Sequence, residues 1–203
     1  MWIMEGRGRV DPVALEVSYA VFGVVDDEEW PDERPSAHTN GLVRSMSRGV
    51  LIATGIHTGA IAVSARPLKG VPSAPKVGGW DEVVEISFVA ESGDVRVAAL
   101  MDDAPESLPN LVTGPGSYRL RVHARGRDSN PDGVAEEPVE EYLLMVWPAP
   151  MSAEQVFKAS DTVGELNRRH ARTPVRLDPG WEVAGDVQYE DDEDDEDDEA
   201  VRR

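Results

Sequence analysis

The chain has 203 residues, a net charge of −19 and no cysteine. This length allows one domain of ordinary size plus tails, and the missing thiols exclude disulfides, thiolate metal sites and cysteine nucleophiles, as suits a reducing compartment. Residues 1–10 lack the apolar run of a signal peptide, and no segment has the ~18 apolar residues of a membrane helix. We therefore expect a cytoplasmic protein that does not contact a membrane.

The acidic charge is spread over the whole chain. The last fourteen residues hold ten acidic residues and two arginines, so residues 1–189 keep a net charge of −11. A strongly negative potential repels nucleic acid and anionic membranes and attracts basic surfaces. This balance argues against direct nucleic-acid binding and favours a basic protein partner.

Alternating apolar residues predict the strands in chain order. Residues 13–25 read as one strand that ends at Asp26, and residues 26–48 follow as a long polar connection. Residues 49–68 and 84–101 each read as a hairpin, separated by a linker-like stretch at 66–79. A connection as long as 26–48 is often functional or mobile.

Two later strands show a clearer alternating pattern. Residues 116–125 place Tyr118, Leu120, Val122 and Ala124 on one face, and residues 141–147 form a closing strand that we expect to pair with it. Strands in antiparallel succession, without helical segments between them, predict a mainly β fold, an antiparallel β-sandwich or open barrel, over residues 10–150.

The segment after residue 150 has a different pattern. Ser152-Ala153-Glu154-Gln155 resembles a capping box, which predicts a short helical or irregular extension at 151–170. Residues 171–203 read as a disordered acidic tail. The ten acidic residues at 190–199 either solubilise the protein or attract a basic partner, and the sequence leaves both alternatives open.

The acidic segment after the first strand is the candidate partner-binding site. An aromatic side chain among carboxylates can anchor an interface while the charges guide encounter. The alternative is a solvated loop whose tryptophan folds back onto the core. The spacing of the acidic residues does not match a calcium-binding loop. The candidate residues are Asp26, Asp27, Glu28, Glu29, Trp30, Asp32 and Glu33.

A row of basic side chains alternates with the core residues of the strand at 116–125. This arginine face consists of Arg119, Arg121, His123 and Arg125. Acidic residues precede the next strand, so cross-strand ion pairs with Glu136, Glu137, Glu140 and Glu141 are the simpler interpretation. Left partly unpaired, the same face could bind an anion.

Motifs for catalysis, cofactors or metals are not found in the sequence. The four histidines are scattered without zinc-site spacing, and there is no G-x-S-x-G elbow and no phosphate-binding glycine motif. Paired carboxylates cannot be singled out among 39 acidic residues. We expect no cofactor, no metal and no enzyme activity. A third hypothesis is a hydrolase whose catalytic carboxylates carry no recognisable sequence motif.

Two resemblances accompany these patterns. The segment SYRLRVHARGRD followed by EEPVEEYLLMVWPAP, within residues 116–150, resembles a set of uncharacterised actinobacterial proteins. The order of a LEVSYAVF strand, an acidic Trp-containing loop and a GSYRLRV strand resembles the competence protein J family over residues 13–147. The stretch 66–79, the arginine face and everything after residue 150 have no counterpart there. This second resemblance implies a β-sandwich that blocks a nuclease, with acidic groups facing a basic cleft.

The resulting hypothesis is a non-enzymatic protein-binding module, such as an inhibitor or immunity protein, that engages a basic partner, for example a nuclease, through acidic surface. The alternative is a structural or regulatory adaptor that binds through a sheet edge or an apolar face, with the tail serving only solubility.

Overall fold

The structure, a computed structural model, describes residues 11–27, 30, 39–100, 102 and 104–172. These residues form a mainly β fold of two sheets with one short helix, as the sequence predicted. The acidic tail expected at 171–203 lies outside the described residues from 173 onward. The elements are β1 (Val13–Val17), β2 (Val21–Asp26), β3 (Val43–Met46), β4 (Gly49–Ala53), β5 (Thr58–Pro67), β6 (Glu82–Ala90), β7 (Val95–Ala99), β8 (Gly116–Arg125), β9 (Val134–Ala135), β10 (Glu141–Pro148), β11 (Gln155–Ala159) and α1 (Thr162–Arg172).

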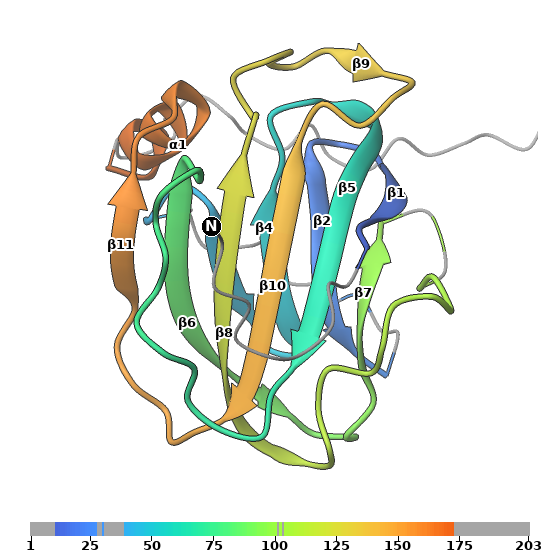
Figure 1. Cartoon of the computed structure of the whole chain (residues 1–203), viewed down its shortest axis with the longest axis vertical. Helices are drawn as coiled ribbons and strands as arrows, with labels where there is room; N and C mark the ends of the chain where they lie inside the picture. Colours follow the sequence, from blue (N-terminus) through green and yellow to red (C-terminus); the bar gives the residue numbers. More distant parts are fainter. Residues whose placement is uncertain (1–10, 28–29, 31–38, 101, 103, 173–203) are drawn as a thin grey trace, which may run out of the picture. The chain divides into compact units, whose positions relative to one another are not determined.

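The two sheets pack face to face across a hydrophobic core (Figure 1). The larger sheet has the order β1-β5-β10-β8-β6-β11, with β9 beside β5, and the smaller has the order β3-β4-β2-β7. The predicted pairing of β8 with β10 is confirmed, as is the buried row Tyr118, Leu120, Val122 and Ala124 on β8. Most pairs are antiparallel, but β5 runs parallel to both β10 and β9.

The first predicted strand is two strands in different sheets. β1 pairs with β5 in the larger sheet, whereas β2 pairs with β4 and β7 in the smaller one. Tyr19 and Ala20 between them take φ values of +59° and +55°, so the chain reverses there. The prediction of one continuous strand was wrong because the alternating pattern continues through this turn.

Both predicted hairpins are also wrong. β4 and β5, expected to pair with each other, lie in different sheets, and so do β6 and β7 (Figure 1). Each turn carries the chain from one sheet to the other across the core. Period-2 alternation reports which face of a strand is buried and does not report which strand lies beside it.

The C-terminal helix begins ten residues after the predicted start. Ser152 leads into β11, which adds an edge strand to β6, and α1 starts at Thr162. Asp161 caps α1 because its Oδ1 accepts the Gly164 N–H at 2.7 Å. The Asp128 carboxylate accepts the free N–H groups of Thr162 and Val163 at 2.8 and 3.0 Å. No helix in the described part of the chain is long and apolar enough to cross a membrane.

Candidate functional site

One end of the sandwich brings acidic residues from two distant segments together. Asp26, the last residue of β2, is only 2% exposed, and its carboxylate accepts the backbone N–H of Glu91 at 2.5 Å. It also accepts the Ser92 N–H at 3.1 Å and the Ser92 hydroxyl. The end of β2 is therefore fixed to the turn between β6 and β7.

Further acidic side chains surround this contact. The N–H of Asp27 donates to the Asp94 carbonyl at 2.9 Å, and Asp27 and Glu91 are exposed. Arg48 lies 3.7 Å from the Glu91 carboxylate, and Arg96 Nε donates to Asp94 Oδ1 at 2.9 Å. We call Asp26, Asp27, Glu91 and Asp94 the acidic end. Four carboxylates face two guanidinium groups there, which leaves the described part of the acidic end negative.

The pKa of Asp26 reflects the groups that stabilise its ionised carboxylate. Burial raises this pKa, but the hydrogen bonds from the Ser92 hydroxyl and the two backbone N–H groups, together with the Arg48 charge, lower it below its ordinary value. Asp26 is therefore a buried anion that fixes the geometry of the loop, while its neighbour Asp27 is exposed.

Trp30 lies against β2. A Cβ added at Gly23 would stand 2.9 Å from Trp30 Cη2, so the indole packs on the bare backbone of that glycine. Trp30 is half-buried in this position, which agrees with the interpretation that it folds back onto the domain. The other candidate residues of this segment, Glu28, Glu29, Asp32 and Glu33, lie outside the described residues.

The arginine face lies on the outer surface of the larger sheet and is mostly paired. Arg121 Nε donates to Glu85 on β6, and Arg119 Nη2 lies 3.6 Å from the other oxygen of the same carboxylate. Arg125 forms an ion pair with Glu141. Of the four predicted partners, all within the described part of the chain, only Glu141 forms an ion pair with this face. β8 lies between β10 and β6, so the carboxylate opposite Arg121 in the register comes from β6.

Glu140 has a different role from the one predicted. Its carboxylate accepts the N–H groups of Gly55 and Ile56 at 2.9 and 2.6 Å and the Tyr142 hydroxyl at 2.5 Å. It is 2% exposed and therefore binds the connection between β4 and β5 instead of the arginine face.

Aromatic rings flank the basic side chains of this face. The Arg121 guanidinium lies 5.4 Å from the Trp147 ring centroid and 5.8 Å from that of Phe157, and Arg125 lies 5.3 Å from the Trp80 ring centroid. Burial lowers the pKa of His123 to about 4, and the Arg121 charge contributes to the same direction. His123 is therefore neutral near pH 7 and adds no positive charge to the face.

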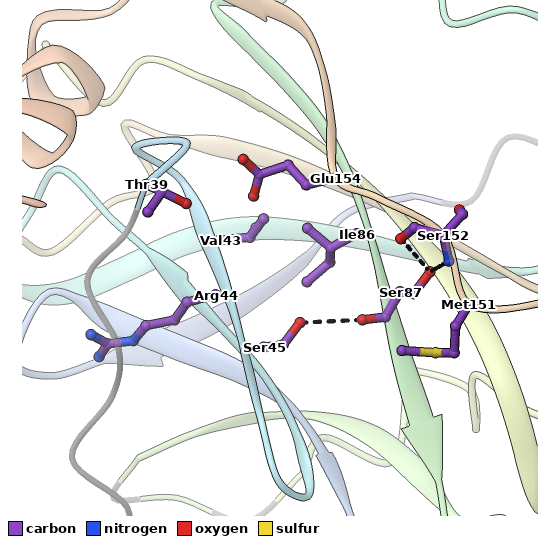
Figure 2. A pocket seen from close by; sticks show the side chains of 9 residues that line it. All are labelled: Thr39, Val43, Arg44, Ser45, Ile86, Ser87, Met151, Ser152 and Glu154. Atoms are coloured by element: carbon purple, nitrogen blue, oxygen red, sulfur yellow. Dashed lines mark hydrogen bonds between the residues drawn. The ribbon is translucent and has the colours of Figure 1, made fainter.

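A groove of about 400 Å³ lies at the open side of the sandwich, between β3, β6 and residues 151–154 (Figure 2). Ser45 Oγ donates to the Ser87 carbonyl at 3.2 Å across the two sheets, and the Ser152 N–H donates to Ser87 Oγ at 3.0 Å. The guanidinium of Arg44 points away from these serines in the same view. The polar groups at the floor of the groove are thus used to join the sheets.

A buried ionic network that no sequence pattern predicted lies under α1. Arg127 is fully buried and forms a bidentate pair with Asp161, at 2.6 and 2.7 Å. Glu82, also fully buried, accepts Arg168 Nη1 at 3.1 Å and the Asp161 N–H at 3.3 Å. Asp161 and Arg168 lie seven positions apart, just before and within α1, but Glu82 and Arg127 lie far from them in the sequence, so no local sequence pattern identifies the network.

Within residues 11–172, apart from the gaps noted above, no group of three or more His, Asp or Glu side chains is arranged to hold a metal ion.

Comparison with known proteins gives two distant structural similarities. No family model matches the chain, and no curated protein matches it. The crystal structure of ComJ, inhibitor of the DNA-degrading activity of NucA, from Bacillus subtilis, is similar at 13% identity and a TM-score of 0.47, over 68% of this chain and 95% of that chain. Crocagin biosynthetic gene J is similar at 16% identity and a TM-score of 0.42, over 69% of this chain and 97% of that chain.

Proposed function

We propose that this protein is a non-enzymatic protein-binding module that engages a basic protein partner through the acidic end. The observation that carries the proposal is the bonding of the Asp26 carboxylate to Glu91 and Ser92. This contact joins two acidic stretches of the chain into one surface and holds the start of the acidic segment 26–33 in a fixed place.

The charges at this end suit encounter with a cationic surface. Asp27 and Glu91 are exposed, and the chain continues from Asp27 into four more acidic residues before residue 34. Complementary charge raises association rates and suppresses binding to acidic competitors. A net charge of −19 adds a long-range field of the same sign.

The class of partner follows from the same chemistry. A protein that binds nucleic acid carries a basic surface that contacts phosphates, and an acidic protein can cover that surface. A nuclease is one such partner, and covering its substrate-binding cleft would make this chain an inhibitor or an immunity protein.

Capture from the native cell tests the proposal. The full-length protein, immobilised, should retain a basic protein at low salt and release it as salt rises, because screening shortens the reach of surface charges. Retention of an acidic protein, or binding that does not change with salt, would contradict an electrostatic interface.

A second function is favoured by a specific observation at the β11 edge of the larger sheet. β11 is an edge strand, and Val156 and Phe157 are 46% and 38% exposed. An edge of this kind can accept an extended peptide as an added strand, which would make the chain an adaptor. A Phe157→Ser variant that loses the captured partner, while variants at the acidic end retain it, would favour the adaptor.

A further inference from the structure

A second groove, of about 360 Å³, lies on the outer face of the larger sheet, beneath the connection between β5 and β6. Arg66, Lys76, Trp80, Arg121, His123, Leu143 and Met145 contribute to its lining, together with Pro72, Ser73 and Ala74. The strands supply a fixed floor, and residues 72–80 supply the wall. Its chemistry differs from that of the acidic end.

The floor contains two arginines with different partners. The register places Arg66 on β5, Met145 on β10 and Arg121 on β8 in one cross-strand row. Arg121 is neutralised by Glu85, the next residue of that row, and its Nη1 donates to the Ser73 carbonyl at 3.0 Å. Among the described residues, Arg66 has no such carboxylate partner, and none of them accepts a hydrogen bond from its buried Nε.

The lining is cationic although the protein is acidic. It includes Arg66, Lys76 and Arg121 and contains no Asp or Glu. Glu85 offsets one charge, yet it is shared between Arg121 and Arg119, so this region of the sheet keeps an excess of positive charge. A buried guanidinium donor without a partner costs free energy, which an anion in the groove would recover.

Most of the remaining lining is apolar. Trp80, Leu143 and Met145 face the same space, and Trp80 packs against His123 with ring centroids 5.3 Å apart. Small-ligand sites combine such apolar walls with a few fixed polar groups and have volumes of roughly 300–1,000 Å³. The groove therefore combines cationic groups with apolar side chains in one space.

We propose that this groove binds a small organic anion, a carboxylate attached to an aromatic or aliphatic group. The carboxylate accepts hydrogen bonds from Arg66 Nε–H and the Lys76 ammonium, and the apolar part lies against Met145, Leu143 and Trp80. A polyanion such as nucleic acid is disfavoured, because the net charge of −19 repels many phosphates at once, while a single carboxylate meets mainly the local positive charge.

Titration of the full-length protein with sodium benzoate tests this assignment. The Arg66 side-chain Nε–H resonance should shift and saturate, and benzyl alcohol, which has the same ring without the charge, should produce no saturable shift. Inorganic phosphate separates the requirement for charge from the requirement for an apolar group, and we expect it to bind more weakly than benzoate. Saturation by benzyl alcohol equal to that by benzoate would overturn the role of the charge.

Substitutions locate the site. Arg66→Gln should weaken benzoate binding by about tenfold or more, as expected for loss of a charge-assisted contact. Arg169→Gln, at an exposed arginine of α1, is the matched control and should bind benzoate like the original protein. Thermal unfolding of both variants checks that they are folded, and Lys76→Gln, at an exposed position, reports on the same groove if Arg66→Gln unfolds. Failure of benzoate to saturate, or equal binding by both groove variants and the control, would overturn the proposal.

Discussion

The carboxylate of Asp26 accepts the backbone N–H of Glu91 at 2.5 Å, although the two residues are 65 positions apart in the chain. Asp26 ends β2, and Glu91 begins the turn from β6 to β7, so the contact joins the two sheets at one end of the sandwich. The exposed side chains of Asp27 and Glu91 are consequently presented on one surface.

Replacement of this anchor should be costly. Asp26→Asn removes the charge that receives the three donors of Glu91 and Ser92, and we expect a loss of about 1–3 kcal/mol in the free energy of unfolding. Because the pKa of Asp26 is lowered in the folded protein, its contribution is present above about pH 4 and is lost as the pH falls through the folded-state value. Urea unfolding near pH 7 and near pH 3 measures both effects.

The control for this prediction is Glu106→Gln, at an exposed acidic residue of the connection between β7 and β8. It should change the unfolding free energy by less than about 0.5 kcal/mol. An Asp26→Asn variant as stable as this control would show that the hydrogen bonds to Glu91 and Ser92 contribute nothing.

The correctly predicted parts of the fold depend on one signal, the alternation of apolar and polar residues along a strand. The faces of β8 were correct because Tyr118 and Leu120 are buried while Arg119 and Arg121 alternate with them. The strand partners were wrong because alternation carries no information about neighbours. The helix start was missed because Asp161 caps it without an acidic residue three positions later, where Gly164 stands.

The candidate site was predictable only in its local part. The acidic segment after β2 was evident, but its contact with Glu91 depends on the turn between β6 and β7, which the predicted hairpin placed within one sheet. The partner of Arg121 was missed for a related reason. The β8–β10 pairing was correct, but Glu85 comes from β6, the second neighbour of β8, which the sequence pattern does not indicate.

Stability should fall as the pH rises toward neutrality because of Glu82. Burial raises its pKa to about 7, the nearby Asp161 charge adds to this, and Arg127 and Arg168 oppose it. The folded protein thus retains a proton that the unfolded chain loses near pH 4.5, so the free energy of unfolding decreases between about pH 4.5 and pH 7. The full effect is on the order of 3 kcal/mol.

Glu82→Gln checks this pH dependence, since the amide cannot titrate. Urea unfolding in steps between about pH 5 and pH 8 should show a flatter profile for the variant than for the original protein. This window is distinct from that of Asp26, whose pKa is lowered. Parallel profiles for the two proteins would exclude Glu82 as the titrating group.

Gly164→Ala should destabilise the protein, against the usual preference of helices for alanine. In an exposed helix the change stabilises by about 1 kcal/mol. Here a Cβ would lie 2.6 Å from Asp161 Oδ1 and 2.7 Å from Arg127 Nη2, within the buried network. A lowered midpoint of thermal unfolding is the expected result. Leu166→Ala, at a 44% exposed position of α1, is the control and should have a small effect.

Loss of Glu85 should be more damaging than loss of Glu141. Glu85→Gln leaves Arg119 and Arg121, 4% and 5% exposed, without their shared anion, and breaking a buried pair costs about 3–5 kcal/mol. Glu141→Gln breaks only the exposed pair with Arg125 and should cost about 1 kcal/mol or less. Denaturant unfolding of the two variants compares them directly, and equal losses would contradict the structural role of Glu85.

The central claim is that the acidic end meets a basic partner, and its most direct test is the association rate with the captured partner as a function of ionic strength. Asp27→Asn with Glu91→Gln removes exposed charge there, and Asn tolerates the φ of +58° at residue 27. Glu136→Gln with Glu137→Gln removes two exposed charges near β9, at the other end of the sandwich (Figure 1). The account predicts that the first pair slows association several-fold at low salt and reduces its dependence on salt, while the second has the smaller effect. Equal effects of the two pairs, or no effect of the first, would contradict it.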